Sequence, residues 1–159
     1  MGFFDKLDDN TKTTAGLSRD SIGTYWQKIT KIEEAVSRKK LDMLRVVKTT
    51  LKVIEGTLTP GTETTQVIML GGNEYVEADV RRFYCGVSGE TMEAANETPF
   101  KTIGERLTQM VGVTVEVEVK GRAYEDKEGR PQTFISAYVR RPILPDQLAE
   151  EGIDPNKFG

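Results

Sequence analysis

Hydrophobic and polar residues alternate with a period of two in several short runs of the chain, which is the pattern of strands that bury one face. The clearest run lies at residues 113–120, where valines fill the odd positions and polar residues the even ones. The same pattern predicts strands at residues 25–35, 41–55, 64–70 and 133–141. The chain is therefore expected to be built mainly from short strands.

The alternation also predicts which side chains point away from the core. In the second predicted strand the apolar residues alternate with polar ones, so Lys48 and Lys52 are expected to share one exposed face. In the last predicted strand the aliphatic residues should face the core, which turns Phe134, Tyr138 and Arg140 outward. Both faces are candidates for contact with a partner.

Between the third and fourth predicted strands the period changes to that of a helix. Asn73 can cap a helix whose apolar residues run from Val76 to Val87 at helical spacing. A second helical signal has Thr98 as its cap and Pro99 as its first residue. Two helices are therefore expected within this connection.

The order of three strands, a helical insert and two strands predicts a mainly β fold. It fits a five-stranded OB-fold-like antiparallel barrel with helices between strands 3 and 4, although other five-stranded barrels share the pattern. We expect three parts: a flexible N-terminal segment at residues 1–23, the barrel at 24–141 and an acidic C-terminal tail at 142–159.

Composition narrows the chemistry of the chain. There is no histidine and only one cysteine, Cys85, so the usual zinc ligands and the His-based nucleophilic pairs of hydrolases are missing. We expect Cys85 to be a small packed residue, and we expect no metal, no cofactor and no enzymatic step. No apolar run reaches the ~18 residues of a membrane span, and the start lacks the features of a secretory signal, so a cytoplasmic protein is expected.

The formal net charge is -3, but the charges are unevenly distributed along the chain. Residues 25–53 carry eight basic side chains against three acidic ones, and the connection at 37–40 reads SRKK. Residues 146–159 carry four acidic side chains against Lys157 alone. Local charge, rather than the sum, determines which partners a surface attracts.

Cations along a groove together with exposed aromatic rings are what binding of single-stranded nucleic acid requires, because phosphates meet the cations and bases stack on the rings. The candidate residues lie on the first two strands, in the basic connection and around the last hairpin. They are Tyr25, Trp26, Lys28, Lys31, Arg38, Lys39, Lys40, Lys48, Lys52, Arg122, Lys127, Arg130, Phe134, Tyr138 and Arg140. The aromatic residues have an alternative role in the core, and strand lysines are often simply solvated.

Several segments resemble one known family. Gly23-Thr24-Tyr25-Trp26 opens the first strand, the run from residue 44 ends in Val53-Ile54-Glu55-Gly56, Val111-Gly112 precedes the valine strand, and YEDKEG occupies 124–129. In these segments the chain resembles bacteriophage single-stranded DNA-binding proteins of the OB-fold type, over roughly residues 23–141. The resemblance implies sequence-independent binding and protection of single-stranded DNA in phage replication or recombination, in the cytoplasm of the host cell.

The C-terminal stretch has two alternative roles. Many replication proteins that bind single strands carry an acidic tail that recruits partner proteins, and the candidates for such contacts are Asp146, Glu150, Glu151, Asp154 and Phe158. Alternatively, the prolines of this stretch hold it along the barrel as a strap. The sequence does not decide the oligomeric state, and a homo-oligomer is one of the alternatives.

Other functions fit parts of the sequence. Glu118-Val119-Lys120 matches the Glu-x-Lys element of some metal-dependent nucleases, and Glu116 lies on the same strand face, but no convincing aspartate accompanies them. A structural or assembly barrel that never contacts nucleic acid is a second alternative. A barrel that prefers RNA is a third.

Overall fold

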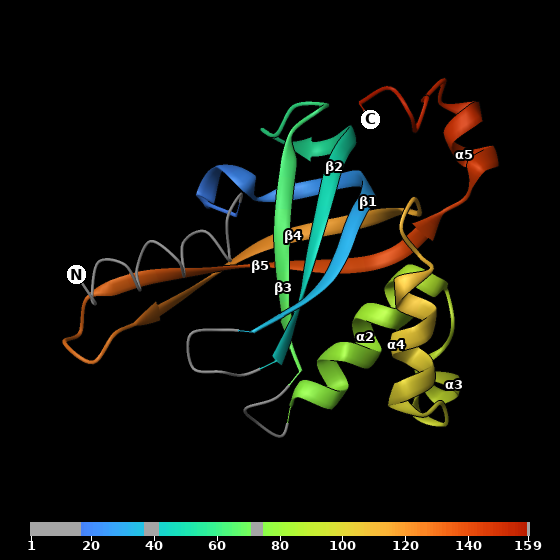
Figure 1. Ribbon diagram of the computed structural model, residues 1–159. Helices are drawn as coiled ribbons and strands as arrows, with labels where there is room; N and C mark the ends of the chain where they lie inside the picture. Colours follow the sequence, from blue (N-terminus) through green and yellow to red (C-terminus); the bar gives the residue numbers. More distant parts are fainter. Residues whose placement is uncertain (1–16, 37–41, 71–74, 159) are drawn as a thin grey trace.

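The computed structural model describes residues 17–36, 42–70 and 75–158. In these ranges a short 3-10 helix, η1 (Arg19–Ser21), precedes three strands, β1 (Gly23–Val36), β2 (Asp42–Gly56) and β3 (Glu63–Met69). Three helices follow, α2 (Val76–Ser88), α3 (Met92–Asn96) and α4 (Phe100–Thr108). The chain then forms β4 (Thr114–Glu125), β5 (Pro131–Ile143) and α5 (Pro145–Glu150), as Figure 1 shows. The predicted mainly β fold, with its helices between the third and fourth strands, is confirmed.

The described strands form one antiparallel sheet in the order β3-β2-β1-β4-β5. β1 lies at the centre because it pairs with both β2 and β4. The two edge strands, β3 and β5, share no backbone ladder in the part of the chain described. The side-chain amide of Gln66 in β3 nevertheless donates to the carbonyl oxygen of Ala137 in β5 at 3.0 Å. The OB-like barrel is therefore a curled sheet with one open seam, across which this side chain reaches.

The inner face of the sheet packs against α2 and α4. Buried residues of β1, such as Tyr25 and Ile29, join valines of β4 and the apolar faces of the two helices in one core. α2 lies directly against β5, because a Cβ atom at Gly86 would collide with the carbonyl oxygen of Val139. Gly86 therefore sets how closely this helix approaches the sheet.

Part of the interior between the strands is polar. The amide nitrogen of Gln27 donates to the hydroxyls of Thr50 and Thr64, at 3.0 and 3.2 Å, and all three residues are buried. Lys48 lies beside them and is also fully buried. Burying polar groups costs free energy unless they form hydrogen bonds, so this cluster constrains how the strands fit together.

The ends of the helices differ slightly from expectation. α2 begins at Val76 with Tyr75 as its N-cap, and the predicted cap Asn73 lies outside the described residues. α4 begins one residue later than predicted, with Pro99 as its N-cap. Thr98 instead bonds back to the carbonyl of Ala94 at the end of α3, a short helix that the sequence pattern did not predict.

β4 and β5 extend beyond the rest of the sheet. The pairing of β4 with β1 ends at Val119 opposite Gly23, whereas β4 and β5 remain paired as far as Glu125 opposite Pro131. Residues 121–135 therefore form a two-stranded arm, seen as the orange hairpin at the left of Figure 1. Near the base of the arm, Arg19 of η1 donates a hydrogen bond of 3.0 Å to Thr133.

The C-terminal segment, residues 144–158, folds back on the outer side of the sheet. Leu148 of α5 joins Trp26, Leu51 and Ile143 in a second, smaller hydrophobic cluster. The segment described here is therefore a strap, as one of the two alternatives for this stretch predicted. None of the described helices has both the length and the apolar character needed to cross a bilayer.

Candidate nucleic-acid interface

The outer face of β4 and β5 carries three exposed aromatic rings. Strand alternation sends Ile135, Ala137 and Val139 against the core, and it leaves Phe134 and Tyr138 57% and 45% exposed on the other side. Their predicted orientation is confirmed. Tyr124, 49% exposed, points to the same side from β4, next to the row that pairs Arg122 with Phe134.

Basic side chains lie among these rings. Arg122 is directly opposite Phe134 in the strand register, and no ion pair involves Arg122 in the described part of the chain. The Arg140 guanidinium lies 4.9 Å from the centre of the Tyr138 ring and 2.7 Å from a carboxylate oxygen of Glu118. The hydrogen bond from Arg140 holds the pKa of Glu118 below its usual value, so this carboxylate stays ionised.

The tip of the arm is a tight turn organised by Asp126. Its carboxylate accepts hydrogen bonds from the backbone of Glu128 and Arg130, at 3.0 and 2.9 Å, which lowers the pKa of Asp126. The Arg130 side chain folds onto the same carboxylate and onto Glu128, so its charge is shared within the turn. Lys127 is exposed there and enters no ion pair among the described residues.

Two predicted interface residues lie in the interior instead. Tyr25 is fully buried, where its hydroxyl donates to the carbonyl of Ile22 at 3.2 Å. Lys48 is equally buried, so the prediction that it shares an exposed face with Lys52 is wrong. Burial lowers the pKa of Lys48 to about 7, because the charged form loses its hydration. Neither side chain is accessible to a nucleic acid in this structure.

Trp26 and Lys52 lie on the outer face but are covered by the C-terminal segment. Trp26 is 7% exposed, and its indole donates to Glu116 at 3.2 Å. The Lys52 ammonium lies 4.9 Å from the Trp26 ring centre and 2.9 Å from a carboxylate oxygen of Glu151. The expectation of an exposed Trp26 platform is therefore wrong, because α5 packs on this ring.

The exposed rings of Tyr124, Phe134 and Tyr138 define what we call the aromatic face. The basic side chains of the β1–β2 hairpin are not part of it. Lys31 is exposed and pairs with Glu33 at 3.2 Å, which lowers the pKa of that carboxyl. Lys28 is half-buried and donates to Asn156 of the C-terminal segment at 3.2 Å. The predicted contacts Arg38, Lys39 and Lys40 lie outside the described residues.

The predicted partner-binding residues are spread along the C-terminal segment. Asp146 and Glu150 are exposed on α5, and Glu151 is held by Lys52. The Asp154 carboxylate accepts the backbone N–H of Asn156 at 2.9 Å. The Phe158 ring lies against Gly61, and it is 41% exposed.

The carboxylates of the nuclease alternative have arginine partners. Glu116 binds Arg141 at 3.2 Å, and Glu118 binds both Arg140 and, at 3.5 Å, Lys120. Within the described ranges, no cluster of three or more metal-ligating side chains is found. In this structure the two glutamates act as ion-pair partners on the outer face.

The sequence pattern missed Tyr124 and Arg141 as members of this face. Tyr124 continues the alternation of β4, but the predicted strand stopped at Lys120, short of it. Arg141 lay inside the predicted last strand, where alternation assigned it to the core side, and an irregularity in the register beside Glu116 turns it to the outer face. Cys85 is partly buried against the core, as expected, and its sulfur lies 3.4 Å from that of Met92. Burial raises the pKa of the Cys85 thiol.

No protein-family model matches the chain, and no curated protein is significantly similar to it.

Proposed function

We propose that this protein binds single-stranded DNA without sequence preference, on the outer face of β4 and β5. One observation carries the proposal: Phe134 and Tyr138 are exposed on the same face of one strand, each beside an arginine. The two rings are four positions apart in the sequence, which corresponds to about 13 Å along a strand. Flat rings at such spacing offer separate platforms for bases of an extended strand.

The chemistry of the face suits a partner without defined sequence. Every base has a flat face that can stack, so aromatic platforms tolerate any sequence, and each stacked base contributes roughly 1–3 kcal/mol. Arg122 and Arg140 supply cations for phosphates beside the rings. Lys120 and Arg141 extend this set of cations along the same face.

The test is a titration of fluorescent oligonucleotides by anisotropy, with single-stranded and double-stranded DNA of mixed sequence at low and at raised salt. We expect tighter binding of the single strand and an affinity that falls as salt rises. Equal binding of both forms, or none, contradicts the proposal, and the absence of binding favours a structural barrel. A matched RNA oligonucleotide decides whether RNA is preferred.

Following the resemblance described above, we further propose a role in protecting single strands during phage DNA replication or recombination, in the host cytoplasm. The exposed acidic residues of the C-terminal segment, Asp146, Glu150 and Asp154, are then candidate contacts for replication or recombination proteins. Substitution of these three residues by alanine should leave affinity for oligonucleotides unchanged, because they lie outside the aromatic face.

A further inference from the structure

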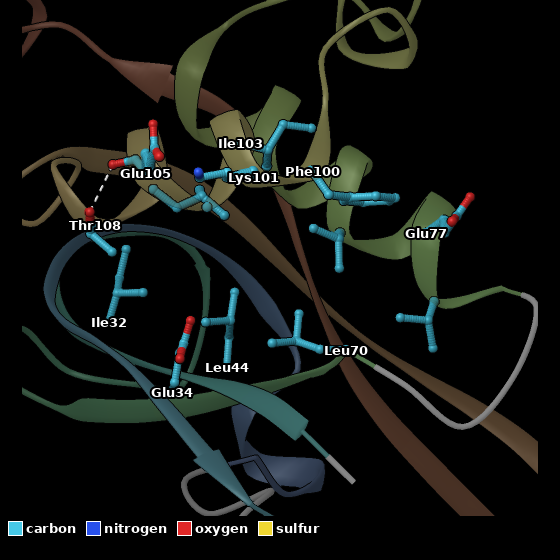
Figure 2. Close-up of a pocket in the computed structure, with 14 residues that line it drawn as sticks. Ile32, Glu34, Leu44, Leu70, Glu77, Phe100, Lys101, Ile103, Glu105 and Thr108 are labelled. Carbon is cyan, nitrogen blue, oxygen red and sulfur yellow. Dashed lines mark hydrogen bonds between the residues drawn. The ribbon is translucent and has the colours of Figure 1, made fainter.

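A groove lies between helices α2 and α4 on one side and two strands on the other. The strands contribute the last residues of β1 and the first residues of β2, beyond the part of β1 that pairs with β4. The groove has a volume of about 660 Å³, which is in the ~300–1,000 Å³ range of binding pockets. Figure 2 shows Ile32, Leu44 and Leu70 on one side of it and Phe100 and Ile103 of α4 on the other. The groove therefore has apolar walls supplied by elements far apart in the sequence.

The rim of the groove is acidic. Glu34 of β1, Glu77 of α2 and Glu105 of α4 line it together with a single cation, Lys101. All three carboxylates are exposed, and none of them enters an ion pair within the described residues. The described part of the rim therefore carries more negative than positive charge, which favours a cationic partner.

One wall of the groove is held rigidly. The Arg81 guanidinium lies 4.1 Å from the centre of the Phe100 ring. Arg81 also donates to the carbonyls of Ala95 and Thr98, at 2.6 and 2.8 Å, and so ties α2 to the start of α4. A preorganised apolar wall loses little conformational entropy when a partner binds.

Gly104 of α4 leaves open space beside it in the groove. It belongs to the lining of the groove, and a Cβ atom built on it meets no other atom within 4 Å. Glycine in the middle of a helix costs roughly 0.5–1 kcal/mol relative to alanine. At Gly104 no close packing of the described chain requires this residue, in contrast to Gly86.

We infer that this groove is a docking site for a short amphipathic helix of a partner protein, one that carries apolar anchors flanked by lysine or arginine. The apolar walls take the anchors, and the three glutamates take the flanking cations. α4 has nine residues, which corresponds to a length of about 13 Å, so the groove accommodates two or three turns of a partner helix. This surface is separate from the aromatic face and serves a protein, not a nucleic acid.

The probe is a fluorescein-labelled synthetic helical peptide with leucines at positions i, i+3 and i+7 and lysines on its polar face. Its control has glutamate in place of every lysine. Measured by anisotropy with the full chain, the lysine peptide should bind at least tenfold more tightly than the glutamate peptide. Equal binding of the two peptides, or no binding, overturns the inference.

Variants then locate the binding. Gly104→Leu fills the groove and should weaken binding of the lysine peptide at least tenfold, whereas the double variant Glu77→Lys with Glu105→Lys should reverse the preference between the peptides. Gly104→Leu should unfold no earlier than the parent in a thermal melt, because leucine favours helices more than glycine does. Unchanged peptide binding by Gly104→Leu shows a different site and overturns the inference.

Two further measurements separate the alternatives. Affinity of Gly104→Leu for single-stranded oligonucleotides should equal that of the parent chain, so a failure of DNA binding and a failure of docking are told apart. Sedimentation velocity tests whether the occupant is a second copy of this chain. A dimer that becomes a monomer on Gly104→Leu substitution overturns the inference in favour of self-association.

Discussion

Lys48 Nζ donates a hydrogen bond of 2.6 Å to the side-chain amide oxygen of Gln66, and Gln66 in turn donates to the backbone of β5. A lysine from the second strand is thereby linked to the open seam of the sheet. No carboxylate is among the causes of its lowered pKa, which is due to burial. The amine therefore has a neutral hydrogen-bond partner in the interior, and it forms no ion pair with any residue in the described ranges.

This arrangement predicts a dependence of stability on pH. The pKa of Lys48 is about 7 in the folded chain, whereas an unfolded lysine titrates near about 10.4. Between these values the unfolded chain binds more protons, so the free energy of unfolding rises with pH, by up to about 1.4 kcal/mol per pH unit. Below the folded pKa both states are protonated, and the contribution stays constant.

Lys48→Met isolates this contribution, since methionine fills much of the same space without a charge. In urea unfolding the parent should gain stability relative to Lys48→Met as the pH rises above 7. The raised pKa values of Tyr84 and Cys85 act in the opposite direction, but they are common to both proteins and cancel in the difference. A difference that does not change with pH contradicts the prediction.

Removal of either exposed ring should weaken DNA binding. We expect Phe134→Ala and Tyr138→Ala each to lose roughly 1–3 kcal/mol of affinity for a single-stranded oligonucleotide, or about 5- to 150-fold. Tyr75→Ala is the matched control, because Tyr75 is an exposed aromatic residue at the start of α2, away from the aromatic face. If the control variant loses as much affinity as the other two, the aromatic face is not the interface.

Arg122 should contribute charge rather than sequence recognition. Substitution Arg122→Ala is expected to weaken binding of all DNA sequences to a similar extent. It should also reduce the slope of the logarithm of affinity against the logarithm of salt concentration by about one. Affinities for several oligonucleotides at a series of salt concentrations test this, and an unchanged slope places Arg122 outside the contact.

The second hydrophobic cluster gives a direct optical readout, because Trp26 is the sole tryptophan of the chain. Leu148→Ala should lower the free energy of unfolding by about 2 kcal/mol. It should also shift Trp26 emission to longer wavelength and increase quenching by acrylamide. Leu144→Ala in the same segment is the control, since Leu144 is exposed. Equal effects of the two variants refute the role assigned to Leu148.

Two glycines in neighbouring helices should respond in opposite ways to the same change. Gly86→Ala forces a Cβ atom against the carbonyl oxygen of Val139, so we expect a clear loss of stability. Gly104→Ala meets open space, so we expect a gain of roughly 0.5–1 kcal/mol. Thermal and denaturant unfolding of the two variants measure both effects, and a loss at Gly104 would show that the site is more crowded than the structure indicates.

Periodicity predicted most of the secondary structure, but it gave the wrong side-chain orientation in β2, where the strand contains a bulge. Thr50 pairs with Gln27 and Lys52 with Trp26, so Leu51 has no partner of its own and the alternation changes phase there. Lys48 is thereby sent inward while Lys52 remains on the outer face. A one-residue shift of this kind cannot be recognised from the spacing of apolar residues, so the sequence pattern did not predict the inward orientation of Lys48.

The β5 face was predictable for the opposite reason. Between Gln132 and Val139 its register with β4 has no irregularity, so simple alternation gave the orientation of Phe134 and Tyr138 correctly. The covering of Trp26 was not predictable, because it depends on Leu148, more than a hundred residues further along the chain. Contacts between distant segments of this kind are not encoded in local periodicity.

The two-stranded arm has a mechanical consequence. From Arg122 outward, the backbones of β4 and β5 pair with each other and with no other described strand, and a two-stranded ribbon is marginally stable on its own. We therefore expect the portion of the chain that presents Tyr124 and Phe134 to bend more easily than the section that carries Tyr138, where β4 also pairs with β1. Under the proposed function, a single strand lying across both rings would contact a firmly paired section of the sheet at Tyr138 and a more easily bent section at Phe134, and the arm would adjust to the curvature of that strand.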